Sequence, residues 1–135
     1  MTYTPRHAFG LFAATCVLVA GMAAAGEYLR GKLYAIDGDT FVIRATGEHI
    51  RVAGVDAPEL HPCHCAAECS LAARARALAQ TLLDQGPVTI SRIEPDRYGR
   101  TVAAVDVAGR DLGGRLIAAG LARPYRYPER RRPWC

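Results

Sequence analysis

Three short polar clusters contain the residues of this chain that could do chemistry. They are Asp37–Thr40, Arg51 followed by Asp56–Glu59, and Asp96–Arg100. Their carboxylate oxygens suit a hard divalent cation such as Ca²⁺. Their arginine forks suit a phosphate whose negative charge grows in a transition state. Phosphodiester hydrolysis needs this combination of groups, so the clusters predict a metal-dependent nuclease.

The N-terminal part of the chain is typical of a secretory signal peptide. Residues 8–26 contain no charged side chain, Arg6 and His7 precede them, and Ala23–Ala25 offers small residues for cleavage. We therefore predict a signal peptide over residues 1–25, a single small domain over residues 26–135, and export to the periplasm or medium. The alternative is an uncleaved membrane anchor, with residues 8–25 as the tether, because the apolar run nearly suffices to span a bilayer.

Basic residues are concentrated at the C-terminus, although the formal net charge of the chain is a modest +4. Five arginines face a single acid, Glu129, in this region: Arg123, Arg126, Arg130, Arg131 and Arg132. Such a segment can contact a polyanion. The alternative is a solvated, frayed terminus without a specific partner.

Four cysteines lie outside the predicted export segment: Cys63, Cys65, Cys69 and Cys135. An even number of cysteines in an exported chain predicts two disulfides, and the spacing leaves three pairings open. Because Cys63 and Cys65 are too close for an easy mutual bridge, we expect one of them to reach Cys135. The alternative is a metal site that includes His61 and His64, but the spacing is not a standard zinc-finger pattern.

Alternating apolar residues and turn signals predict five strands. They are Leu29–Ile36, Thr40–Ile43, His49–Val52, Val88–Ile93 and Thr101–Val107. The pair Asp37-Gly38 is typical of a tight hairpin turn between the first two strands.

Two helices are predicted around the last two strands. The first runs from about Glu68 to Asp84, because Leu71, Ala75, Leu78 and Leu82 recur at a helical spacing. The second follows Asp111 as its N-cap, carries Leu112, Leu116 and Ile117, and ends at Gly120. We therefore expect an α+β, mainly β fold, a five-stranded OB-fold barrel with two helices, whose face could bind oligonucleotides.

Four segments in this order and spacing resemble the staphylococcal nuclease (thermonuclease) family. They are Ile36–Ile43, Arg51–Glu59, Asp96–Thr101 and Gly120–Arg123, and the similarity extends from about residue 28 to 127. The resemblance implies a Ca²⁺-dependent endonuclease that acts on DNA and RNA, with an OB-fold core. We take a monomer as the default state of so small a chain.

The resemblance also implies a metal site and a base. Asp39 and Asp56 would bind the metal through their carboxylates, and Ala57 would bind it through its backbone carbonyl. Such oxygen-only coordination is what Ca²⁺ prefers. Glu59 would orient or deprotonate the attacking water, a role commonly worth about 10² to 10⁴-fold in rate.

The same resemblance implies that substrate is held by cations and rings. Arg51 and Arg100 would be catalytic residues that hold the scissile phosphate and stabilise the charge of the transition state. Arg97, Tyr98 and Tyr125 would bind the nucleotide, and a stacked base on tyrosine contributes roughly 1–3 kcal/mol.

Two other interpretations account for some of these features. A non-catalytic nucleic-acid-binding OB module would keep the basic residues, but it has no need of the full set of carboxylates and arginines. A membrane-tethered surface protein would keep residues 8–25 and use its cysteines to bridge to a partner.

Overall fold

The computed structural model describes residues 32–135, so the predicted signal peptide and the membrane-tether alternative lie outside the described residues. The elements in chain order are β1 (Leu33–Ala35), β2 (Thr40–Ile43), β3 (Glu48–Val52), β4 (Val55–Asp56), α1 (Ala66–Leu83), β5 (Val88–Pro95), β6 (Thr101–Val107), β7 (Arg110–Asp111), α2 (Leu112–Ala118) and β8 (Arg123–Pro124). Each of the five predicted strands and both predicted helices has a counterpart within residues 32–135, and the prediction of a mixed, mainly β fold is confirmed. The first predicted strand, Leu29–Ile36, begins outside the described residues, and its described part forms a strand only over Leu33–Ala35. The short strands β4, β7 and β8 were not predicted.

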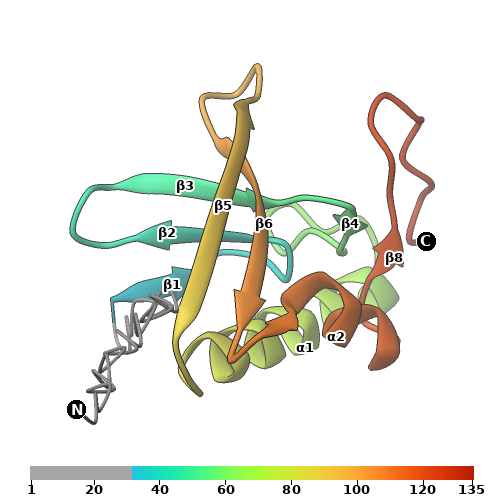
Figure 1. Ribbon diagram of the computed structural model, residues 1–135. Helices are drawn as coiled ribbons and strands as arrows, with labels where there is room; N and C mark the ends of the chain where they lie inside the picture. Colours follow the sequence, from blue (N-terminus) through green and yellow to red (C-terminus); the bar gives the residue numbers. More distant parts are fainter. Residues whose placement is uncertain (1–31) are drawn as a thin grey trace, which may run out of the picture.

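The main sheet follows the order β1-β2-β3-β6-β5, and β7 pairs with β6 (Figure 1). Strands β3 and β6 are parallel, whereas the other pairs are antiparallel. A separate antiparallel pair joins β4 to β8 and places Asp56 opposite Arg123. The chain segment that follows the first three strands is thereby brought beside the C-terminal region.

The predicted five-stranded OB-fold barrel is not closed, because β1 and β5 end the sheet path and do not pair within residues 32–135. The outer edge of β1 is instead satisfied by side chains of α1. Gln80 accepts a 2.9 Å hydrogen bond from the N–H of Ala35 and donates to the carbonyl of Leu33 at 3.1 Å. Arg76 donates to the carbonyl of Ala35 at 2.9 Å. Strand β1 has only three residues, and these bonds occupy backbone groups that a strand closing the barrel against β1 would need. The fold is therefore an open, OB-like sheet.

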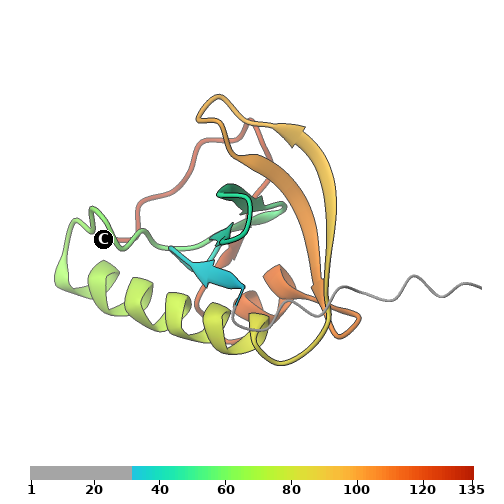
Figure 2. The same cartoon turned by 90° about the vertical axis from the view of Figure 1, so that its left-hand side faces the viewer.

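Helix α1 lies across the open side of the curved sheet (Figure 2). Its most buried residues are largely small: Ala72, Ala75, Ala79, Leu82 and Leu83. Leu71 and Leu78, which were predicted on the same face, are only partly buried at its margins. Small side chains at the contact let the backbone of the β1–β2 turn approach closely. A Cβ placed on Gly38 would lie 2.8 Å from the Cβ of Ala75.

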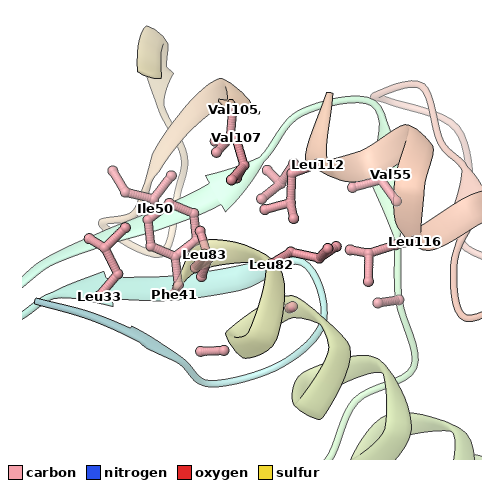
Figure 3. Packing of buried hydrophobic residues seen from close by; sticks show 14 of the residues in the cluster. Leu33, Phe41, Ile50, Val55, Leu82, Leu83, Val105, Val107, Leu112 and Leu116 are labelled. Atoms are coloured by element: carbon pink, nitrogen blue, oxygen red, sulfur yellow. The ribbon is translucent and has the colours of Figure 1, made fainter. Parts of the chain in front are cut away.

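The apolar core joins the sheet to both helices (Figure 3). Phe41 and Ile50 from the sheet pack near Leu83 of α1, and Leu112 and Leu116 bring in α2. Asp111 caps α2 as predicted, because its carboxylate accepts the N–H of Gly114. Gly120 follows the helix with φ +71°, the left-handed conformation that terminates helices. No helix among residues 32–135 is long and apolar enough to cross a membrane.

Candidate active site

Asp39 is buried at the end of the β1–β2 turn, directly before β2. Its Oδ2 accepts a 2.7 Å hydrogen bond from the N–H of Ala57, and its Oδ1 accepts one from the hydroxyl of Thr40 at 3.0 Å. The first of these bonds ties the turn to the segment that follows β4. Burial raises the pKa of the Asp39 carboxyl, and the neighbouring Arg51 and the bond from Ala57 offset part of that effect.

Arg51 points from β3 toward the same carboxylate. The sheet register places Arg51 opposite Thr40, so its guanidinium can reach the end of the neighbouring turn. Nη2 lies 3.3 Å from Oδ2 of Asp39, and Nη1 donates to the carbonyl of Val52 at 2.8 Å. The side chain is only 11% exposed. A guanidinium fixed in this way is a preorganised positive charge, which suits stabilisation of a phosphate.

Asp56, Ala57 and Glu59 follow one another at the end of β4, and a single guanidinium gathers their oxygens. Arg131 donates to Oδ1 of Asp56 at 2.5 Å and to Oε1 of Glu59 at 2.7 Å. Its Nη2 also lies 3.4 Å from the carbonyl oxygen of Ala57. Burial disfavours the charged guanidinium, but the bond to Glu59 and the attraction of Asp56 outweigh it and raise the pKa of Arg131.

Arg100 lies apart from these residues, at the turn between β5 and β6. Its Nε donates to Oδ2 of Asp96 at 2.7 Å, and its backbone N–H bonds to Oδ1 of Asp96 at 3.0 Å. Asp96 is therefore the organiser of this turn. The hairpin projects from the body of the fold (Figure 1). Within residues 32–135, no hydrogen bond or ion pair joins Arg100 to Asp39, Asp56 or Glu59.

The residues predicted to bind substrate are divided between two places. Tyr98, with an exposed fraction of 68%, lies on the β5–β6 turn between Arg97 and Arg100. The two guanidinium carbons are 4.9 and 5.4 Å from the centre of its ring. Tyr125 follows β8, is half-buried, and bonds through its N–H to the carbonyl of Gly54 at 3.0 Å.

The cysteines form two disulfides, Cys63–Cys69 and Cys65–Cys135. Of the two cysteines expected to reach Cys135, it is Cys65 that does so. All four thiols outside the predicted export segment are thereby used, which argues against the alternative cysteine–histidine metal site. His64 instead bonds to the buried carboxylate of Glu68 through its backbone N–H and its Nδ1, at 2.6 and 2.9 Å, and these bonds lower the pKa of Glu68.

Two residues of the C-terminal tail (residues 125–135) belong to the site and were not singled out from the sequence. Besides Arg131, Trp134 places its Nε1 3.3 Å from Oδ2 of Asp56. The arginine-rich composition had suggested a polyanion partner or a frayed end. The predicted bridge from Cys135 does bring the tail back to the loop after Glu59, but it did not indicate which tail residues would meet the carboxylates.

The oxygen atoms at this site are of the kinds that bind a hard cation. Two carboxylates and a backbone carbonyl, from Asp56, Glu59 and Ala57, already surround one positive group, the guanidinium of Arg131. Such an all-oxygen donor set is the kind that Ca²⁺ takes. Among residues 32–135, however, no three His, Cys, Asp or Glu side chains converge in a ready-made metal cluster.

Comparisons with known proteins point to one family. The sequence model described as "Staphylococcal nuclease homologue" matches residues 49–133. The chain is 29% identical over 126 residues to "Micrococcal nuclease" of Shigella flexneri, covering 85% of this chain and 68% of that protein. It is 31% identical over 121 residues to "Thermonuclease" of Staphylococcus hyicus, covering 82% of this chain and 71% of that protein. The chain therefore belongs to the family of staphylococcal nuclease homologues.

Proposed function

We propose that this protein is a Ca²⁺-dependent endonuclease that hydrolyses phosphodiester bonds of DNA and RNA. The observation that supports this most directly is the convergence of Asp56, Ala57 and Glu59 oxygens on one cationic group. Asp39 and Arg51 lie next to this cluster, because Asp39 is bonded to the N–H of Ala57. Membership of a family whose relatives are named nucleases gives the reaction class.

Each of the five residues at this site would have its own task in the reaction. Asp39, Asp56 and the carbonyl of Ala57 would hold the cation, which when bound supplies neutralisation of phosphate charge. Glu59 would accept a proton from water as the water oxygen attacks phosphorus. The P–O bond to the leaving sugar oxygen would break in line with this attack, and that oxygen would take a proton from solvent. Arg51 would stabilise the additional negative charge of the phosphate oxygens in the transition state.

Asp96 holds Arg100 on the β5–β6 turn. With substrate bound, this turn would lie beside the nucleic acid, and Arg100 and Arg51 would both contact the scissile phosphate. Arg97 and the exposed ring of Tyr98, which lie on the same turn, would contact the neighbouring nucleotide. An exposed ring between two guanidiniums is a suitable surface for stacking a base.

Export is part of the proposal as well. The two disulfides, Cys63–Cys69 and Cys65–Cys135, favour an oxidising compartment such as the periplasm or the medium. Mass spectrometry of the native N-terminus tests this point. A mature start near Gly26 would support a cleaved signal peptide, and an intact N-terminus would support the membrane anchor.

The deciding experiment is a degradation assay with plasmid DNA and RNA, using the oxidised protein with Ca²⁺ or with a chelator. We expect cutting that depends on Ca²⁺ and falls by about 10² to 10⁴-fold in Glu59→Gln. Nucleic-acid binding by that variant should change little. If folded wild-type protein binds nucleic acid but never cuts it, the chain is a non-catalytic binding module.

A further inference from the structure

The guanidinium of Arg131 contacts three of the oxygen atoms that are proposed to bind the cation or the attacking water. Arg131 bonds to the carboxylates of Asp56 and Glu59 at 2.5 and 2.7 Å, and its Nη2 lies 3.4 Å from the carbonyl oxygen of Ala57. Arginine stays charged at every ordinary pH, and its planar fork matches carboxylate oxygens. The positive charge at this cluster is therefore supplied by the chain itself.

The tail is fastened directly after Arg131, at its last two residues. Trp134 places its indole N–H 3.3 Å from Oδ2 of Asp56, and the guanidinium of Arg123 stacks 3.5 Å from the centre of the indole ring. The last residue, Cys135, is bonded to Cys65 in the loop before α1. Figure 2 shows the tail returning to that loop. The contact is thus held by covalent and non-covalent restraints.

The tail also contacts the candidate general base. A cavity of about 300 Å³ separates the tail from the loop before α1, and both Glu59 and Arg131 line it. The side chain of Glu59 is 41% exposed, and its Oε1 is occupied by Arg131. Arg131 therefore competes with water and phosphate for this oxygen.

We infer that residues 131–135 form an autoinhibitory cap, in which the guanidinium of Arg131 occupies the place of the catalytic divalent cation. The inference rests on the proposed metal site. A divalent cation and the guanidinium of Arg131 compete for these oxygens, since like charges in close contact repel each other. Cation binding is therefore coupled to displacement of Arg131 from Asp56 and Glu59.

The disulfide makes this competition intramolecular. Because Cys135 remains bonded to Cys65, a displaced Arg131 stays close to the site at a high effective concentration. The apparent cation affinity of the native protein is then reduced by the small fraction of molecules whose tail is open. Removing the competing guanidinium removes this penalty.

The test is isothermal titration of the full, oxidised protein with CaCl₂, which does not depend on activity. Arg131→Gln is compared with Arg130→Gln, because both remove one positive charge from the same tail. Arg130 is exposed and does not line the cavity. We expect the Ca²⁺ dissociation constant to fall at least about tenfold in Arg131→Gln and to change by less than about threefold in Arg130→Gln.

A second readout follows the tail itself. Trp134 is the single tryptophan of the chain, so its fluorescence reports on the environment beside Asp56. We expect Ca²⁺ to change the emission of wild-type protein in the same concentration range in which it binds. The double variant Cys65→Ser/Cys135→Ser, with its fold checked by circular dichroism, should also bind Ca²⁺ more tightly than wild type.

The outcomes separate the cap from the metal site. Equal or weaker Ca²⁺ binding by Arg131→Gln, in protein that does bind Ca²⁺, would overturn the cap and leave the proposed metal site standing. Unchanged Trp134 emission during saturating Ca²⁺ binding would also overturn it. If neither wild type nor any variant binds Ca²⁺, the proposed metal site itself is refuted, and the cap is refuted with it.

Discussion

The backbone N–H of Ala57 donates a 2.7 Å hydrogen bond to Oδ2 of Asp39, eighteen residues earlier in the chain. This bond brings the β1–β2 turn to the segment after β4, and it is possible because Gly38 has no side chain. A Cβ on Gly38 would lie 2.9 Å from the Cβ of Ala57 and 2.8 Å from that of Ala75. The position of Asp39 thus depends on close packing of the turn against α1.

Gly38→Ala is therefore expected to damage both stability and the site. The added methyl group must displace the turn or α1, and overpacking of this kind costs typically about 1–3 kcal/mol of unfolding free energy. Urea denaturation measures this loss, and Ala75→Gly in the same chain should restore part of it. A variant as stable as wild type would show that the turn has room that the packing does not indicate.

Arg51 is expected to stabilise the fold by compensating the buried carboxylate of Asp39. Arg51→Ala leaves that carboxylate without its nearby guanidinium, and breaking a buried pair in this way costs about 3–5 kcal/mol. Arg51→Lys keeps the charge and should cost clearly less. Arg110→Ala, at an exposed arginine of β7, is the control and should stay within about 0.5 kcal/mol of wild type in urea denaturation.

Glu48 links three strands and should make stability depend on pH. Its carboxylate in β3 accepts two bonds from Arg92 of β5, at 2.9 and 2.6 Å, and one from Thr101 of β6 at 2.9 Å. The bonds from Arg92 and then from Thr101 outweigh the effect of burial and lower the pKa of Glu48 to about 2.

A lowered carboxyl pKa stabilises the folded state only while the carboxyl is ionised. The contribution is complete above the unfolded-state pKa of 4.5 and is lost as the pH falls toward about 2. Because Arg92 is 52% exposed, solvent screening limits the contribution to about 1 kcal/mol. The stability difference between wild type and Glu48→Gln, measured by urea denaturation, should shrink from pH 7 to pH 3. A constant difference over that range would contradict the assignment.

The two disulfides should contribute unequally to stability. Cys65–Cys135 closes a separation of 70 residues and Cys63–Cys69 one of 6. Loop-closure entropy assigns about 4 kcal/mol to the longer loop and about 2 kcal/mol to the shorter one. Thermal denaturation of the two Cys→Ser double variants compares them directly. A larger loss from the Cys63/Cys69 pair would indicate that local geometry, and not chain entropy, dominates.

The order of strands and helices was predictable because it is written in local patterns. Thr101–Val107 alternates in hydrophobicity and forms β6 with the same bounds. Asp111 stands where a helix N-cap belongs, and it caps α2. The motif from Asp56 to Glu59 and its likeness to one family were likewise visible in the sequence, because the residue types and their spacing along the chain carry that information.

The open sheet and the covered site were decided by contacts between distant segments. Gln80 and Arg76 take the backbone groups at the edge of β1, and no local pattern shows where a long polar side chain will reach. The arginine-rich composition of the tail likewise did not single out Arg131 as the residue that meets Asp56 and Glu59. The position of Arg131 depends on the Cys65–Cys135 bridge and on electrostatic attraction. Both connect segments that are far apart in the sequence, so no local pattern shows their effect.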